Sequence, residues 1–275
     1  MKGTLYIVST PIGNLDDITL RALHILKTVD VIAAEDTRHS LKLLSHFGIS
    51  KPMISYWREK DKVRSEEIIK KLHSGKSVAL ISDAGTPGIS DPGSVLIRKA
   101  IEEDIPVVSI PGPSACIAAL SLSGLPAEEF TFLGFLPSKK LRRLNILKTL
   151  SMEKRTVVFF EAPHRILGTL TDMVLIMPGR KAALVKEITK IHEEVLRGTV
   201  SEILVEIGKT KIAGEYVLVL EGRSEDIEIP VEDALAEIHA LIQKGFRRKD
   251  AVSRIAETYG FSKKELYDQS LKEIP

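Results

Sequence analysis

The sequence has 275 residues, of which 44% are hydrophobic and 28% are charged, and its formal net charge is only +2. This is the composition of a globular protein of about two domains, and no hydrophobic run approaches the roughly 18 residues of a membrane span. The single cysteine, Cys116, excludes an intrachain disulfide and a cysteine-based metal cluster, and residues 1–5 leave no room for a signal peptide, so we expect a cytoplasmic protein.

Hydrophobic runs alternate with helical patterns through the first half of the chain. The runs are short and bounded by turn residues, which is typical of buried strands. We expect strands at residues 5–8, 29–34, 54–56, 77–81 and 105–110, with helices between them. This alternation predicts a mostly parallel sheet. The loop after the first strand contains only Gly13, so the G-x-G-x-x-G fingerprint of dinucleotide-binding folds is absent.

The loop at residues 82–93 follows the fourth expected strand. Five of its twelve residues are Gly or Pro, so neither a helix nor a strand continues through it. Ser90 or Asp91 is expected to cap the next helix. The simplest interpretation is a βα connection, but such connections usually need only about 2–6 residues. A stiff loop with few side chains, at the carboxyl end of a strand, favours a ligand-binding role.

Polar or Gly/Pro-rich residues follow two other expected strands of this sheet. Residues 35–38 read Glu-Asp-Thr-Arg, and residues 111–115 read Pro-Gly-Pro-Ser-Ala before a helix of small residues. One interpretation of the first segment is a helix cap, Asp36 or Thr37, with solvated neighbours. The other is that Glu35, Asp36 and Arg38 face the same cleft as the loop at residues 82–93, which we call the glycine loop. The start of the helix after residue 115 offers backbone N–H donors.

The second half begins near Pro126 and contains three further expected strands, at residues 130–135, 156–160 and 182–185, with a last one at 216–220. Arg165 follows the second of these strands and is expected to pair with Glu161 or with substrate. Residues 139–155 hold seven Lys or Arg against one Glu. Such a run is often a solvated helix face, but the excess of one sign also fits a surface that contacts phosphates.

The pattern from residue 229 to 275 is purely helical. Two amphipathic helices are expected to end at Gly245 and Gly260, and a third follows Ser262. Basic residues, including Arg247 and Arg248, cluster at the centre of this segment. A small nucleic-acid-binding bundle and a packing or dimerisation element both fit the pattern.

Six motifs in one order carry a resemblance to a known family. They are SDAGTP at residues 82–87, EDTR at 35–38, PGPSA at 111–115, SGLP at 123–126, GFLP at 134–137 and EITK at 187–190. With these motifs the chain resembles the bacterial ribosomal RNA small-subunit methyltransferase I family, the 16S rRNA cytidine-2'-O-methyltransferases of the tetrapyrrole methylase superfamily. The match runs from about Thr4 to Gly222, and the helical tail fits more loosely.

The resemblance implies two α/β domains with a ligand cleft between them, at residues 1–126 and 127–224, and a small C-terminal helical domain at 225–275. It implies S-adenosyl-L-methionine as methyl donor, a homodimer, and a decoding-region cytidine of the small-subunit rRNA, or of the assembled small subunit, as target. The donor pocket would be lined by Pro11, Ala84, Gly85, Thr86, Ile89, Ser90, Ser114, Ala115, Ala162, Ala213 and Gly214.

The chain departs from the superfamily at one position of the glycine loop. Tetrapyrrole methylases carry Gly-Asp-Pro where this chain has Gly85, Thr86 and Pro87. The contact expected of that aspartate then falls to the Thr86 hydroxyl, to Asp83 or to the backbone.

Transfer of a methyl group to a ribose hydroxyl needs positioning and a base that takes the hydroxyl proton. Carboxylates at the expected strand ends are the candidates, and basic residues beside them would hold phosphate or the charged oxygen. The catalytic set is therefore expected among Glu35, Asp36, Arg38, Asp83, Arg165, Glu187 and Lys190, with Glu35/Asp36 and Glu187/Lys190 favoured. Each of these residues has an alternative role in an ion pair that holds a loop. Glu35→Gln or Glu187→Gln is expected to slow turnover without loss of donor affinity.

RNA contacts are expected from Lys139, Lys140, Arg142, Arg143, Arg247 and Arg248. Two rival functions remain: a small-molecule or protein methylase of the same superfamily, and a non-catalytic RNA-binding factor for ribosome assembly. The basic segment argues against the first, and donor binding would separate the second. A nucleotide-hydrolysing enzyme is disfavoured because no G-x-x-x-x-G-K-[ST] loop occurs.

Overall fold

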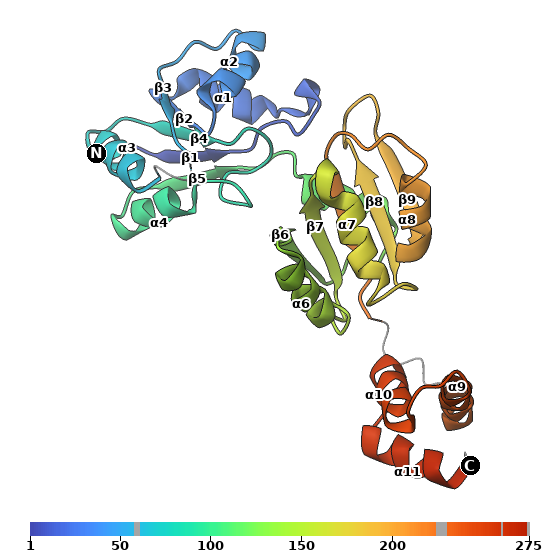
Figure 1. Cartoon of the computed structure of the whole chain (residues 1–275). Coiled ribbons are helices and arrows are strands. Elements are labelled where there is room, and N and C mark those ends of the chain that lie inside the picture. Colours follow the sequence, from blue (N-terminus) through green and yellow to red (C-terminus); the bar gives the residue numbers. More distant parts are fainter. Residues whose placement is uncertain (58–60, 224–229, 260, 274–275) are drawn as a thin grey trace. The chain divides into compact units, whose positions relative to one another are not determined.

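The computed structural model describes residues 1–57, 61–223, 230–259 and 261–273. Its contacts divide the chain into two compact units, Met1–Glu221 and Gly222–Pro275. In the described ranges the first unit contains two five-stranded sheets, and the second consists of helices (Figure 1). The predicted division of the first unit after residue 126 stays a prediction, and residue 224 lies outside the described residues.

The first sheet is entirely parallel, as the alternating pattern predicts, with the order β3-β2-β4-β1-β5. Its second and fourth strands in chain order are buried along their whole length, and the first in all but Tyr6, because helices cover both faces of the sheet. The strands are β1 (Leu5–Val8), β2 (Val31–Ala34), β3 (Met53–Ser55), β4 (Val78–Ile81) and β5 (Val107–Ile110). The connections contain η1 (Leu15–Asp17), α1 (Leu20–Thr28), α2 (Thr37–His46), α3 (Asp61–His73) and α4 (Ser94–Glu102).

The chain reverses its direction of travel across this sheet between β1 and β4. These strands are neighbours, yet β1 leads to β2 on the far side of β4, and β4 leads to β5 on the far side of β1. Accordingly α1 and α2 pack on one face, while α3 and α4 pack on the other (Figure 1). Open α/β sheets bind ligands at such a switch point, outside the carboxyl ends of the strands.

The second sheet is mixed, with the order β6-β7-β10-β8-β9, and only β6 and β7 are parallel. The strands are β6 (Phe130–Phe135), β7 (Thr156–Glu161), β8 (Lys181–Lys186), β9 (Glu194–Thr199) and β10 (Tyr216–Leu220). The sequence analysis does not predict β9. Its residues are exposed or half-buried at the sheet edge, and they include charged side chains and Gly198, so no hydrophobic run marks it.

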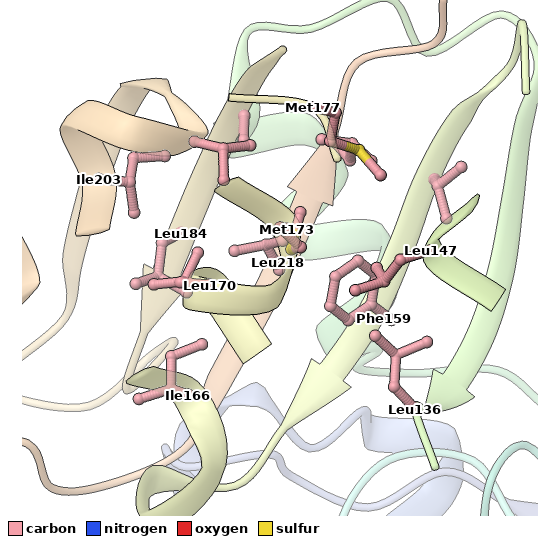
Figure 2. Close-up of a cluster of buried hydrophobic side chains, with 14 of the residues drawn as sticks. Leu136, Leu147, Phe159, Ile166, Leu170, Met173, Met177, Leu184, Ile203 and Leu218 are labelled. Atoms are coloured by element: carbon pink, nitrogen blue, oxygen red, sulfur yellow. The ribbon is translucent and has the colours of Figure 1, made fainter. Parts of the chain in front are cut away.

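Helices cover both faces of the second sheet. On one face α6 (Lys140–Leu150), α7 (Pro163–Val174) and α8 (Val200–Ile207) enclose the largest core of the molecule. Figure 2 shows Phe159 of β7 beside Leu136 and Leu147, with Leu170 and Met173 of α7 near Leu218 of β10. The opposite face is covered by α5 (Ala115–Ser123), which precedes this sheet in the sequence but packs in its core.

The only cysteine lies inside this α5 interface. Burial raises the pKa of the Cys116 thiol to about 11, so very little thiolate exists near neutral pH. We expect the folded protein to react with a thiol reagent at pH 8 roughly a hundredfold or more slowly than free cysteine. A time course with the native and the urea-unfolded chain measures this, and rapid labelling of the native chain would contradict the packing of α5.

The second unit consists of α9 (Val231–Gln243), α10 (Arg248–Tyr259) and α11 (Lys263–Glu273), as the helical pattern predicts. Gly245, at a φ of +90°, ends the first of these helices. The unit has its own core, to which the helices contribute residues such as Leu235, Val252 and Leu266. In the parts of the chain that the structure describes, none of the helices has the length and hydrophobicity needed to span a membrane.

Candidate functional site

The loops after β1 and β4 are joined at the switch point of the first sheet. Thr10 and Gly85 exchange both backbone hydrogen bonds, with N···O distances of 2.9 and 3.1 Å. The hydroxyls of Ser9 and Thr86 lie 2.7 Å apart, and the Thr10 hydroxyl donates to the carbonyl of Ser82. These contacts hold the glycine loop directly over the carboxyl ends of both strands.

The glycine loop contains several residues in the left-handed backbone region. Gly85 has a φ of +76°, Gly88 of +83°, and even Ser90 of +67°. The expected cap of α4 by Ser90 or Asp91 is wrong: Gly93 occupies the N-cap position and offers no side chain. The physical reason is that the loop needs a further turn, closed by the bond from Gly88 N to Pro92 O, before the helix begins.

The loop after β5 also reaches the point where the loops after β1 and β4 are joined. A Cβ atom on Gly112 would lie 3.0 Å from Ser9 Cβ, and one on Gly85 would lie 3.9 Å from Pro113 O. Ser114 caps α5, its side chain accepting from Ile117 N. Of the expected donor-binding residues in this half, Ala84 and Ile89 are exposed, Thr86, Ser90, Ser114 and Ala115 are half-buried, and Pro11 and Gly85 are buried.

The polar segment after β2 combines a cap with a link to the glycine loop. Asp36 caps α2, and its carboxylate accepts from Arg38 N at 2.8 Å and pairs with the Arg38 guanidinium at 3.2 Å. The Arg38 side-chain and backbone hydrogen bonds lower the pKa of Asp36. Asp83 accepts from Asp36 N at 3.1 Å, which ties the ends of β2 and β4 together. The helix-cap interpretation is therefore confirmed for Asp36.

The remaining site candidates lie along one edge of the second sheet. Tyr216 at the start of β10 is in register with Glu161 and with Lys186, the last residues of β7 and β8. At this end of the sheet, candidate site residues stand next to each of the three strands. Ala162 follows β7, Glu187 follows β8, and Ala213 and Gly214 precede β10.

Glu187 organises the loop after β8. Its Oε1 accepts from Lys190 Nζ and from Glu215 N, both at 2.9 Å. Gly214 is required beside it, because a Cβ there would lie 2.4 Å from Glu187 Oε1 and its φ is +87°. The hydrogen bond from Lys190 is the main cause that lowers the pKa of Glu187. Burial opposes the charged form of Lys190, but the bonds to Glu187 and Glu215 outweigh it and raise the pKa of Lys190.

Segments of the two sheets come into close contact at two glycines, Gly13 and Gly134. A Cβ on Gly13, in the loop after β1, would lie 2.7 Å from Lys190 Cγ and 2.8 Å from Thr189 Oγ1. A Cβ on Gly134 of β6 would lie 2.7 Å from Ser90 Oγ of the glycine loop. The structure thus brings the loop after β1 against the loop after β8, and the glycine loop against β6, within the first unit.

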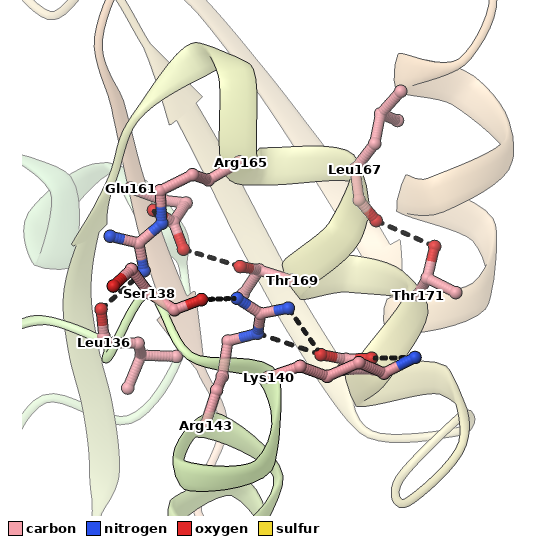
Figure 3. A network of polar contacts seen from close by, with 10 residues as sticks. Leu136, Ser138, Lys140, Arg143, Glu161, Arg165, Leu167, Thr169 and Thr171 are labelled. Carbon is pink, nitrogen blue, oxygen red and sulfur yellow. Dashed lines mark hydrogen bonds and ion pairs between the residues drawn. The ribbon is translucent and has the colours of Figure 1, made fainter.

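Two buried ion pairs hold the segment after β6 (Figure 3). Arg165 pairs with Glu161 at 3.1 Å and donates to Leu136 O, while Glu161 also accepts from Thr169. Arg143 donates to Asp172 at 2.6 and 2.9 Å and to Ser138 O at 3.4 Å. Of the alternatives for Arg165, the structure shows the pair with Glu161.

The predicted role of Arg143 in RNA binding is wrong. Its side chain points inward from α6, is only 9% exposed, and is paired with the buried Asp172. A helical face places neighbouring basic residues on different sides, which a count of charges along the sequence does not resolve. Lys139, Lys140 and Arg142 are exposed around the start of α6. In the second unit Arg247 is exposed, whereas Arg248 donates to Ser270 O.

The roles of three residues near the site are not identified from the sequence: Ser9, Thr10 and Glu215. The Ser9 and Thr10 hydroxyls tie the glycine loop to β1, and Glu215 is a second carboxylate on Lys190, at 2.9 Å. The signal for Glu215 was present, since it stands directly before a strand as Glu161 and Glu187 stand at the ends of theirs. The roles of Ser9 and Thr10 depend on long-range pairing that no local pattern indicates.

Comparisons with known proteins agree with this geometry. The family model of Tetrapyrrole (Corrin/Porphyrin) Methylases matches residues 4–204. The chain is similar to a diphthine synthase structure at a TM-score of 0.61 and 16% identity, covering 80% of this chain and 90% of that one. It is also similar to uroporphyrin-III C-methyl transferase from Thermus thermophilus complexed with S-adenyl homocysteine, at 0.55 and 19%, covering 80% and 97%. These likenesses show the fold.

Relatives of much higher identity match almost the whole sequence. The ribosomal RNA small subunit methyltransferase I of Halalkalibacterium halodurans is 44% identical over 273 residues, which are 97% of this chain and 94% of that protein. The protein of the same name from Escherichia coli O157:H7 is 43% identical over 275 residues, 99% and 96% of the two chains. The chain therefore belongs to the tetrapyrrole methylases and, among them, to the ribosomal RNA small subunit methyltransferase I family.

Proposed function

We propose that this protein transfers a methyl group from S-adenosyl-L-methionine to the ribose 2'-hydroxyl of a decoding-region cytidine in small-subunit rRNA. The observation that carries the proposal is the meeting of the loops after β1, β4 and β5 at the switch point, in a chain whose relatives are named for rRNA methylation. By the same resemblance we propose that it acts in the cytoplasm as a homodimer.

The residues at the facing edges fit such a donor. Ala84, Gly85, Ser114 and Ala115 have small or no side chains, so a ligand can approach their backbone N–H and C=O groups closely. Thr189 Oγ1 is buried, has no hydrogen-bond partner among the described residues, and lies against Gly13 where the loops of the two sheets meet. When bound, the donor supplies an electrophilic methyl carbon on a sulfonium.

Thr86 does not simply replace the aspartate of the superfamily motif. Its hydroxyl is already bonded to Ser9 at 2.7 Å, which fixes the loop to β1. The loop backbone and Asp83, which is half-buried beside Ala84, are the other candidates for the contact expected of that aspartate.

The hydroxyl proton needs an acceptor in the same place. Asp36 and Glu187 are poorly suited, because each is paired with a cation and its pKa is lowered. We assign the role of base to a carboxylate of the first sheet, Asp83 or Glu35, which are half-buried at the ends of β4 and β2. The hydroxyl must be held about 3–3.5 Å from the methyl carbon, so positioning by both edges contributes most of the rate.

Calorimetric titration with S-adenosylhomocysteine tests the donor site. Gly85→Ala puts a Cβ at a φ of +76° inside the loop proposed to hold the donor, and this backbone strain is expected to weaken or abolish binding. Gly48→Ala is the matched control, because Gly48 has a φ of +64° but no atom within 4 Å of the added Cβ. Both variants cost about 1–2 kcal/mol of stability for the backbone. If the wild type does not bind S-adenosylhomocysteine, the result favours the alternative function of a non-catalytic RNA-binding factor.

The exposed cations at the start of α6 are expected to contact rRNA phosphates. Each lost contact lowers the salt dependence of RNA affinity by about 0.7 in the log–log slope on single strands. Arg142→Glu should therefore flatten the slope, while Arg155→Glu, whose guanidinium is already paired with Glu153 at 2.8 Å, should change it less. Equal slopes for the wild type and Arg142→Glu would contradict the contact.

A further inference from the structure

Three phenylalanines, Phe132, Phe160 and Phe135, form a row on one face of the second sheet. The row begins in the hydrophobic core and ends where β6 ends. The rings of Phe132 and Phe160 meet edge to face with centroids 4.9 Å apart, and those of Phe160 and Phe135 meet at 5.6 Å. Phe132 and Phe160 pack against the same core as α5. Phe135, the last residue of β6, is 55% exposed, so most of its ring is in contact with solvent.

The position of Phe135 is set by an irregularity in β6. The pairing with β7 shifts register between Phe132 and Phe135, and Gly134 adopts a φ of +62°. Gly134 lies against Ser90 of the glycine loop. A Cβ added at position 134 would lie only 2.7 Å from Ser90 Oγ. Behind it, the ion pairs of Arg143 and Arg165 hold Leu136 and Ser138. A rigid backbone thus presents an exposed ring beside the glycine loop.

Basic residues follow this ring closely in the sequence. Lys139, Lys140 and Arg142 stand within seven residues of it and are exposed at the start of α6, and Lys140 Nζ lies 3.6 Å from Asp172. Exposed aromatic rings next to cations that track a phosphate backbone are how proteins bind single-stranded nucleic acids, because every base offers a flat face for stacking. RNA is recognised mostly where its bases are unpaired.

We propose that Phe135 is a base-stacking residue: an unpaired base of the rRNA substrate lies against its ring while the α6 cations contact the adjoining phosphates. This rests on the proposed function and adds a specific RNA subsite to it. Stacking needs no hydrogen-bond readout, so the subsite contributes affinity and orientation to the nucleotide that enters the site.

The test compares two probes, a twelve-nucleotide oligocytidine RNA and an abasic ribose-phosphate chain of the same length, by fluorescence anisotropy over a range of salt. Phe135→Ala should bind the oligocytidine roughly 5- to 150-fold more weakly, with an unchanged salt slope. Its affinity for the abasic chain should equal that of the wild type, and Phe135→Trp should restore base binding. Phe130→Ala is the matched control, because Phe130 is exposed at the opposite end of β6.

Donor affinity and methylation separate the possible failures. S-adenosylhomocysteine should bind Phe135→Ala as it binds the wild type, and KM for small ribosomal subunits lacking the modification should rise. Loss of donor binding would overturn the proposal and assign the ring to the adenine of the donor. Unchanged RNA affinity and KM, in a wild type that methylates the subunit, would overturn the stacking alone. A wild type that neither binds RNA nor methylates would overturn the proposed function together with it.

Discussion

Replacing Asp172 by alanine is expected to destabilise the first unit by about 3–5 kcal/mol. Asp172 accepts two hydrogen bonds from Arg143, at 2.6 and 2.9 Å, and the side chains of the two residues are 2% and 9% exposed. Without the carboxylate, a buried guanidinium keeps its charge and loses its partner, whereas the wild type leaves neither group uncompensated. Equilibrium unfolding in urea measures the loss.

Two variants distinguish the buried pair from an ordinary surface ion pair. Glu153→Ala removes the partner of Arg155, whose side chain is 48% exposed, and should cost no more than about 1 kcal/mol. The double variant Arg143→Met, Asp172→Leu should recover much of the stability lost in Asp172→Ala, because it leaves no unpaired charge. A cost for Asp172→Ala as small as that for Glu153→Ala would show that the pair is not buried as described.

The second large effect is expected on the chemical step. If Asp83 or Glu35 takes the hydroxyl proton, Asp83→Asn or Glu35→Gln should slow single-turnover methylation about 10²–10⁴-fold and leave S-adenosylhomocysteine affinity unchanged. Asn at position 83 keeps an oxygen that can accept from Asp36 N, so the link between β2 and β4 survives the change. Rapid-quench measurements at saturating donor isolate this step.

The matched control for these variants is Asp36→Asn. It removes a carboxylate from the same edge, and asparagine caps a helix as well as aspartate does, so α2 should keep its start. We expect its rate to stay close to that of the wild type. Rates near the wild-type value for both Asp83→Asn and Glu35→Gln would contradict a base on the first sheet.

The strands of the first sheet could be predicted because each is a short hydrophobic run bounded by turn residues. Residues 77–81 illustrate this: β4 is buried on both faces, so its hydrophobicity is continuous. The edge strand β9 could not be predicted, since its half-buried residues need only partial hydrophobicity. The cap of α4 failed for another reason, because the φ values of Ser90 and Gly93 depend on how the loop turns over the sheet.

The site could be predicted at the level of segments rather than of roles. Parallel strands of one sheet end on the same side, so position alone makes Glu35 and Asp83, after β2 and β4, neighbouring candidates, and Glu187 is the corresponding candidate after β8 of the second sheet. The hydrogen bonds that each carboxylate makes depend on partners far away in the sequence, such as Glu215 N for Glu187. The inward direction of Arg143 likewise depends on Asp172, 29 residues later.

The central claim is that this chain methylates a ribose of small-subunit rRNA with a donor held at the glycine loop. A ribose-methylation map of small-subunit rRNA, from cells with and without the protein, tests it most directly. We expect one 2'-O-methylated cytidine to be lost without the protein, to return with the wild-type chain, and not to return with Gly85→Ala. An identical map in both strains, or a change confined to a base rather than a ribose, would contradict it.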